Sequence, residues 1–181
     1  MTTATLSRLG SKADFPGLAG GWHYLDSAAT AQKPQSVIDA VTAALGRDYA
    51  TVHRGVYARS ADMTLAFEAA REKVASLIGG QPGELVFTRG ATEAINLVAY
   101  AYPNKGRVLL SMLEHHSNIV PWQLLRDETG IAIDVCPLTA DGRIDLDAAE
   151  AMLTPAHKLV ALAHVSNVLG SVLDVPRAVA L

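Results

Sequence analysis

The chain has 181 residues, of which 50% are hydrophobic and 18% are charged, and its formal net charge is −3. This balance excludes an intrinsically disordered chain, and 15 basic against 18 acidic residues leave no basic excess for nucleic acid as a main partner. The single cysteine excludes a disulfide framework and a cysteine-rich zinc site, and it suits a reducing compartment.

Residues 1–23 predict a lead-in without a folded element, because glycine and proline cluster between Gly10 and Gly21. No apolar run reaches the roughly 18 residues that a membrane helix needs. The N-terminus also lacks the continuous apolar core of a signal peptide. We therefore expect a cytoplasmic chain that makes no membrane contact.

Two amphipathic helices are predicted next. The apolar spacing from Pro34 predicts a helix that stops near Gly46. A longer helix follows the loop 50–59, with Ser60 as its N-cap and Gly79 at its end. Its apolar stripe, which we interpret as plain core, consists of Met63, Phe67, Ala70, Val74, Leu77 and Ile78.

Beyond Pro82, predicted strands and helices alternate. The strands, which are apolar on both faces, cover residues 84–88, 107–111, 131–135 and 159–163. Two helices cover residues 92–100 and 145–153, another carries Trp122, Leu124 and Leu125, and the first turn of a last one covers 177–181. Apolar strands joined by crossover helices indicate a parallel sheet with helices on both faces. We expect an α/β, doubly wound fold, incomplete because no strand follows the last helix.

Ligands of such sheets bind beyond the carboxyl ends of the strands, so residues there are candidates for a site. After the first predicted strand, Gly90 allows a sharp turn, and Ala91 and Thr92 open a helix. Free backbone N–H groups and a hydroxyl at a helix start can hold a phosphate. An ordinary capped helix start is the alternative, and the sequence contains neither G-x-G-x-x-G nor a Walker P-loop here.

Polar side chains follow two further predicted strands. His115 could stack on a planar ring, transfer a proton, bind a metal or have no function. We expect no metal, because adjacent histidines of an extended segment point apart and no H-E-x-x-H or C-x-x-C sequence adds ligands. Asn167 could meet a hydroxyl or carboxylate of a ligand, or it could satisfy turn backbone. Their convergence on one sheet edge favours a shared pocket.

Reactive groups occur at three other places. Cys136 ends an apolar strand, which favours a small buried side chain over a nucleophile. Lys158 precedes a strand at the opposite sheet edge, which favours a solvated charge over a covalent link to a cofactor. His53 and Arg54 lie in a loop between helices, where a cation and an imidazole could meet an anionic substrate.

Five sequence blocks in fixed order resemble the group II (SUF-type) cysteine desulfurases of the class V aminotransferase family. They are YLDSAATAQKP (24–34), VHRGVY (52–57), ELVFTRGATEAINLVA (84–99), EHHSNIVPWQLL (114–125) and HVSNVLGSVL (164–173). The resemblance implies pyridoxal 5'-phosphate (PLP) as cofactor. It also implies that residues 24–181 are part of the large domain of an aspartate-aminotransferase-like enzyme, with the remainder and the small domain absent.

The resemblance assigns roles to residues that match the family's motifs. The segment matching Ala91 and Thr92 holds the cofactor phosphate in the family. The histidine matching His115 stacks on the pyridine ring and assists proton transfer, and the asparagine matching Asn167 contacts the cofactor or the substrate carboxylate. Four further residues match positions that lie near the substrate in the family's homodimeric enzymes: Ala28, Ala29, His53 and Arg54.

The sequence also departs from the family's pattern. The family's chain is about twice as long, and its PLP-binding lysine, its pyridine-pairing aspartate and its persulfide cysteine match positions beyond Leu181. No lysine of this chain matches the family's lysine, and Cys136 does not match its cysteine.

The resemblance therefore implies the N-terminal part of an enzyme that takes sulfur from L-cysteine, leaves L-alanine and passes the sulfur to an acceptor protein for iron–sulfur cluster assembly. Alone, this chain is expected to be inactive and to associate through an uncovered sheet edge. A non-catalytic remnant that binds a partner, or another class V lyase or transaminase, is the alternative.

Overall fold

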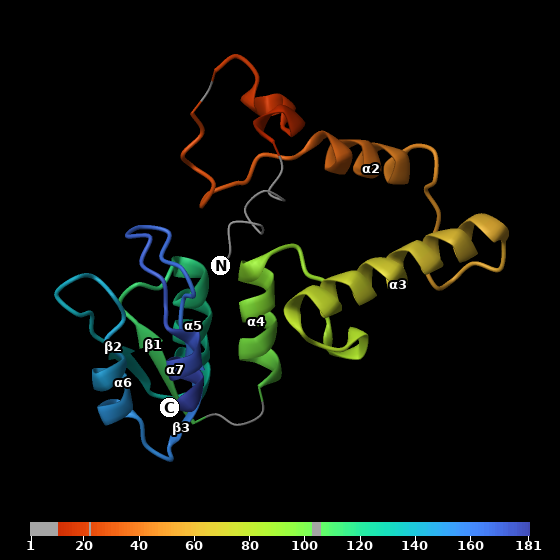
Figure 1. Cartoon of the computed structure of the whole chain (residues 1–181). Helices are drawn as coiled ribbons and strands as arrows, with labels where there is room; N and C mark the ends of the chain where they lie inside the picture. The colour runs from red at the N-terminus through yellow and green to blue at the C-terminus, as the bar shows by residue number, and fades with distance from the viewer. Residues whose placement is uncertain (1–10, 22, 103–105) are drawn as a thin grey trace. The chain divides into compact units, whose positions relative to one another are not determined.

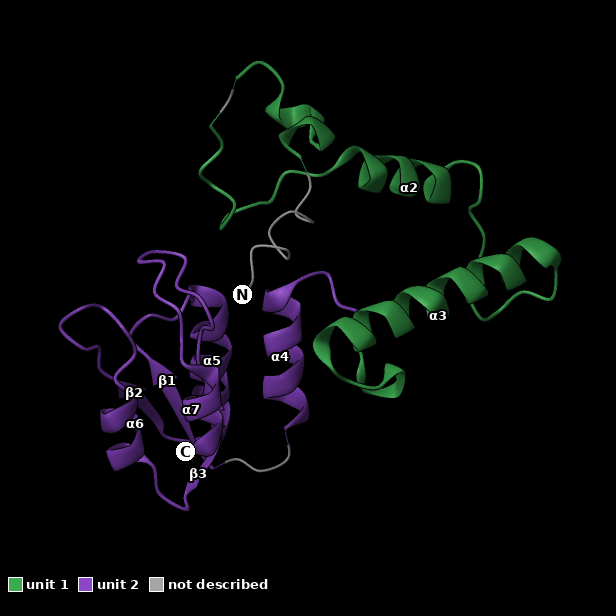
Figure 2. Ribbon diagram, viewed as in Figure 1, with its two compact units in different colours: residues 1–86 green, residues 87–181 purple. Residues whose placement is uncertain are grey.

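The computed structural model describes residues 11–21, 23–102 and 106–181, and the chain divides into two compact units. Unit 1 is Met1–Val86 and unit 2 is Phe87–Leu181 (Figure 2). Residues 1–10 of the predicted lead-in lie outside the described residues. In the part of the chain that is described, no helix is long and apolar enough to cross a membrane.

Unit 1 combines two helices with short 3-10 turns (Figure 1). Its elements are η1 (Lys12–Asp14), η2 (Pro16–Leu18), α2 (Gln35–Leu45), α3 (Ala58–Ile78) and η3 (Pro82–Glu84). The region 11–21, predicted to lack a folded element, thus holds two single turns. The helix predicted from Pro34 is confirmed as α2. Gly79 ends α3 as predicted, in a left-handed conformation (φ 75°) that glycine adopts without steric cost.

The start and the buried face of α3 differ from the prediction. Tyr57, not Ser60, is the N-cap. The Ser60 hydroxyl is instead buried and donates to a carbonyl oxygen of the preceding loop at 2.8 Å. The predicted core stripe is wrong, since none of its six residues is buried. Three are exposed, namely Ala70, Leu77 (85%) and Ile78 (66%). Periodicity shows which side chains share a face, but burial also needs a neighbour that covers that face.

Unit 2 is built around a three-stranded parallel sheet, with strand order β2-β1-β3 (Figure 1). Its strands are β1 (Arg107–Ser111), β2 (Ile133–Cys136) and β3 (His157–Ala161). Its helical elements are α4 (Ala91–Ala101), η4 (His116–Asn118), α5 (Val120–Thr129), α6 (Leu146–Met152) and α7 (Val175–Ala180). Strand and helix alternate along the chain as predicted, and the expected α/β class is confirmed.

Helices cover both faces of the sheet because alternate residues of β1 point to opposite sides. On one face, Val108 and Leu110 pack in a cluster with Trp122 of α5. On the other face, Leu109 packs with Leu146 and other residues of α6. This two-sided burial explains why the strand is a continuous apolar run rather than an alternating one.

The predicted strand at 84–88 is wrong, and two others are displaced. Glu84 ends η3, and no described segment pairs with residues 85–88 as a strand. β2 begins two residues later than predicted and β3 two residues earlier. β3 begins at His157 because that residue pairs with Arg107, whose backbone N–H donates to the Ala156 carbonyl oxygen at 2.8 Å. Ladder partners of this kind are far apart in sequence, and local patterns do not identify them.

Candidate functional site

The N-terminus of α4 presents backbone donors without a side-chain cap. Gly90 is the N-cap at φ 158° and ψ 178°, a conformation that is nearly restricted to glycine. Ala91 and Thr92 follow in the first turn, where amides have no partner within the helix. The Glu93 carboxylate accepts a hydrogen bond from the Arg89 N–H at 2.7 Å. This end of α4 can therefore bind an anion such as phosphate.

His115 is the N-cap of η4, and its ring is exposed and locally oriented. Its Nδ1 accepts from the Ser117 backbone N–H at 3.2 Å and lies 3.0 Å from the Ser117 hydroxyl. Because Nδ1 is an acceptor, the neutral ring carries its proton on Nε2. The ring of His116 meets it edge to face, with centroids 5.8 Å apart. Among the described residues, no group of three or more metal-ligating side chains lies together.

A buried acid lies directly before this histidine. The Glu114 carboxylate accepts from the Ser111 hydroxyl at 2.5 Å, from the Asn118 amide at 2.7 Å and from the Ala163 N–H at 2.9 Å. The Asn118 oxygen in turn accepts from the Trp122 indole N–H at 2.9 Å. This cluster was not predicted from the sequence. The available signal was an acidic residue three positions after the end of a mostly apolar strand, where a buried charge requires compensation.

Asn167 lies in an exposed turn after β3. The turn is closed by an antiparallel bridge between Val165 and Val172. Ser166, rather than Asn167, satisfies its backbone, because the Ser166 hydroxyl accepts from the N–H groups of Val168 and Leu169 at 3.2 and 3.1 Å. No hydrogen bond of the described residues uses the Asn167 side chain, so its amide can meet a ligand.

The segments that carry these residues meet at the carboxyl edge of the sheet in unit 2. β1 and β3 are neighbours, so the loops with His115 and Asn167 follow adjacent strands. The bond from the Ala163 N–H to Glu114 links these loops. α4 packs against η4 and α5, and its N-terminus opens at the same edge (Figure 1). The predicted site residues at this edge are Ala91, Thr92, His115 and Asn167.

The other predicted residues belong to unit 1. Ala28 and Ala29 lie in an exposed turn, in which the Ala29 N–H donates to a carbonyl oxygen at 3.1 Å. His53 has a left-handed backbone (φ 64°), and its Nε2 lies 3.0 Å from the Glu68 carboxylate. Its N–H donates to a hydroxyl of α3 at 2.9 Å. Arg54 is exposed. The roles of these four residues in the site stay predictions.

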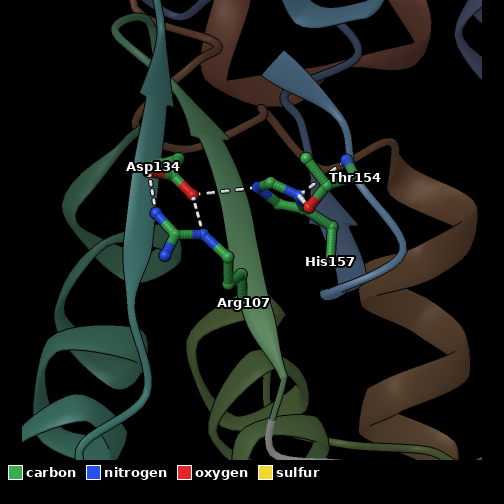
Figure 3. A network of polar contacts seen from close by, with 4 residues as sticks. All are labelled: Arg107, Asp134, Thr154 and His157. Carbon is green, nitrogen blue, oxygen red and sulfur yellow. Dashed lines mark hydrogen bonds and ion pairs between the residues drawn. The ribbon is translucent and has the colours of Figure 1, made fainter.

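A second polar network lies at the opposite, amino edge of the sheet (Figure 3). Asp134 receives two hydrogen bonds from Arg107 and one from the buried His157, whose Nδ1 accepts from the Thr154 N–H. The bonds from Arg107 lower the pKa of the Asp134 carboxyl, His157 adds to this, and burial opposes it. This network joins the starts of three strands, which is a structural role.

Cys136 is fully buried at the end of β2. Its thiol donates to the Asp145 carbonyl oxygen at 3.0 Å, and burial raises its pKa. A high pKa and no solvent contact disfavour the reactive thiolate. The interpretation of Cys136 as a small buried side chain is confirmed.

Comparisons with known proteins agree with the geometry. Residues 23–181 match the family described as Aminotransferase class-V. A cysteine desulfurase of Pectobacterium atrosepticum is 44% identical in an alignment of 180 positions, which covers 93% of this chain and 44% of that protein. A probable cysteine desulfurase of Vibrio cholerae is 46% identical in an alignment of 154 positions, which covers 82% of this chain and 38% of that protein.

Solved structures show the same fold. The apo structure of a cysteine desulfurase from Thermococcus onnurineus superposes with a TM-score of 0.83 at 34% identity, over 92% of this chain and 42% of that one. A cysteine desulfurase of Escherichia coli in its S-sulfonic acid form gives 0.81 at 36% identity, over 99% and 45% of the two chains. This chain thus spans less than half the length of these relatives.

The carboxyl edge of unit 2 fits the cofactor of this family, since class V aminotransferases depend on PLP. The uncapped α4 amides suit its phosphate, the exposed His115 ring suits its planar ring, and the Asn167 amide can meet its polar substituents. The family match covers all described residues from 23 onward. The chain belongs to the class V aminotransferase family.

Proposed function

We propose that this chain is the N-terminal part of a group II (SUF-type) cysteine desulfurase, an enzyme that takes sulfur from L-cysteine with PLP as cofactor. The relatives with 44% and 46% identity are named for this activity or its probable form. The structural observation that carries the proposal is the uncapped N-terminus of α4 at the same sheet edge as His115. A phosphate and a ring would be bound there by separate groups.

Each residue of the edge has a physical task in this proposal. The N–H groups of Ala91 and Thr92, with the Thr92 hydroxyl, hold the phosphate. The His115 ring stacks on the pyridine, and its Nε2 is the atom that holds or donates a proton because Ser117 occupies Nδ1. The Asn167 amide orients polar groups of cofactor or substrate. PLP, when bound, supplies an electron sink for the substrate.

The complete enzyme is proposed to be a cytoplasmic homodimer in which His53, Arg54 and the Ala28–Ala29 turn contribute near the substrate. Its sulfur passes to an acceptor protein for iron–sulfur cluster assembly. The chain by itself turns over no cysteine, because none of its lysines matches the family's cofactor-binding lysine and Cys136 is buried. Exposed valines on the outer strands, such as Val135 (49%) and Val160 (44%), support association of the isolated chain.

The cofactor-binding part is tested by equilibrium dialysis of the chain against PLP and against pyridoxal, which lacks the phosphate. We expect PLP to bind at least about ten-fold more tightly, because charge-assisted hydrogen bonds hold the phosphate. Thr92→Ala should weaken PLP binding about five-fold, whereas Thr129→Ala, at the far end of α5, should leave it unchanged. Equal affinity for the two ligands would contradict the phosphate site.

The catalytic part is tested with L-cysteine and a reductant. Sulfide release by the chain with PLP should not exceed that of free PLP. A clear excess over free PLP would contradict the assignment of the covalent chemistry to residues outside this chain.

A further inference from the structure

The Glu114 carboxylate is buried, 9% exposed, and none of the groups that donate to it is a cation. Its donors are the Ser111 hydroxyl, the Asn118 amide and the Ala163 backbone N–H. A buried acid usually has an ionic partner, because removing a charge from water is costly. Three neutral donors that converge on one carboxylate therefore indicate a specific hydrogen-bond network at this point of the fold.

This arrangement continues the sheet beyond the last strand pair. The β1–β3 ladder ends where Leu110 pairs with Ala161. Past that point, the Glu114 side chain accepts from the Ala163 N–H at 2.9 Å, and the Asn118 amide donates to the Ala161 carbonyl oxygen at 3.3 Å. Side chains of the β1–α5 loop thus take the place of a strand at the exit of β3.

The same bonds enclose the segment that carries His115. Glu114 and Asn118 bond to each other on the interior side at 2.7 Å. Between them, the Ser117 N–H donates to the His115 ring on the exposed side. Because neighbouring residues of an extended backbone point to opposite sides, burial of Glu114 directs His115 outward.

We propose that Glu114 is the positioning residue of His115. Its carboxylate holds residues 114–118 closed against the exit of β3, so that Ser117 keeps the His115 ring in one orientation and one tautomer. The claim that this orientation matters for ligand binding rests on the proposed PLP function. The claim that Glu114 fixes the orientation is independent of that function.

Glutamine is the informative substitution, because it keeps the shape of Glu114 and changes one acceptor into a donor. If its NH₂ occupies the Oε2 position, it faces the NH₂ of Asn118; if it occupies the Oε1 position, it faces the N–H of Ala163. Both orientations place donor against donor. The matched control is Glu128→Gln, the same change on the exposed side of α5.

The experiment combines two readouts on Glu114→Gln, His115→Ala, the double variant and the Glu128→Gln control. The first is the ¹⁵N spectrum of the His115 imidazole in chain labelled at histidine, which reports the Nε2–H tautomer without any ligand. The second is PLP affinity by equilibrium dialysis. If Glu114 acts through His115, the losses of PLP affinity in the two single variants should not add up in the double variant. If the two residues stabilise binding independently, the losses should add.

We expect Glu114→Gln to change the His115 signal from the pure Nε2–H pattern to a mixture and to weaken PLP binding about ten-fold, with no further loss in the His115→Ala background. The control should change neither readout. An unchanged His115 spectrum in Glu114→Gln, or fully additive losses, would overturn the proposal. If wild-type chain binds no PLP, the proposed function fails and the spectrum alone decides the role of Glu114. If Glu114→Gln does not fold, Ser111→Ala replaces it under the same criteria, with a smaller change expected.

Discussion

Two carboxylates stabilise opposite edges of the same sheet in unit 2, and they are compensated in different ways. At the amino edge, Asp134 accepts from the Arg107 guanidinium at 2.7 and 2.6 Å and from His157 at 2.9 Å. At the carboxyl edge, Glu114 accepts only from neutral groups. The first is a partly exposed charge pair, and the second is a buried acid that depends on the number of its donors.

The two kinds of compensation have different consequences for the two edges of the sheet. At the amino edge, the charge pair joins the starts of the strands, and its strength varies with pH. A carboxylate held by neutral donors brings no additional cation to the site and leaves the α4 amides as donors for an anion. A substitution of Glu114 removes the acceptor of all its donors at once, so it affects each of the segments that carry those donors.

The largest expected effect is that of Glu114→Ala. It should lower the free energy of unfolding by about 3 kcal/mol, because buried donors lose their acceptor and a cavity forms. Urea denaturation at low micromolar protein measures this loss. Glu128→Ala, on an exposed surface, should stay within about 0.5 kcal/mol of wild type. A loss below about 1 kcal/mol for Glu114→Ala would show that the donors find other partners.

Cys136 ends β2, the strand next to β1, so the reaction rate of its thiol measures how tightly the carboxyl edge is packed. Its labelling by a disulfide reagent at pH 8 should be about 100-fold slower in the folded chain than in urea, because the thiol is buried and its pKa raised. Glu114→Ala should accelerate the reaction more than a change at Asp134. Rapid labelling of the wild-type chain would contradict the burial of this residue.

Asp134→Ala should cost less, about 2 kcal/mol of unfolding free energy, because Asp134 is more exposed than Glu114 and the donors it leaves can partly reach water. The same denaturation measurement applies. Asp127→Ala, which removes an exposed partner of Arg126, is the control and should change stability by less than about 0.5 kcal/mol. Equal losses for Asp134→Ala and Asp127→Ala would remove the distinction between a built network and a surface pair.

The smallest effect is the pH dependence of that loss. The Arg107 guanidinium, first of all, holds the pKa of the Asp134 carboxyl below its ordinary value. Its stabilisation is therefore fully present above that value and is lost as pH falls through the lower pKa of the folded state. The stability difference between wild type and Asp134→Asn should shrink as pH falls from about 5 through the lowered pKa of the folded state. A difference that stays constant with pH would show that the charge of Asp134 contributes nothing.

Much of this structure follows from local sequence. Apolar runs separated by amphipathic segments predicted the parallel sheet, α2, and the end of α3 at Gly79. The positions of His115 after β1 and of Asn167 after β3 predicted that both would reach the carboxyl edge, since parallel strands end together. Ala91 and Thr92 reach the same edge although the strand predicted before them is absent. The failures at Ser60 and at residues 84–88 share a cause: a cap and a strand each need a partner that local pattern does not specify.

By itself, the sequence determined the fold class, the family and the order of His115 and Asn167 along one sheet edge, because these depend on periodicity and on short motifs. Tertiary structure alone decided which groups compensate the Glu114 carboxylate, since its donors lie as far away in sequence as Ala163. It also decided which residue accepts hydrogen bonds from the backbone N–H groups of the turn at Asn167, and at which residue β3 begins. Hydrogen bonds between distant segments require geometry, and the sequence within any one segment does not encode it.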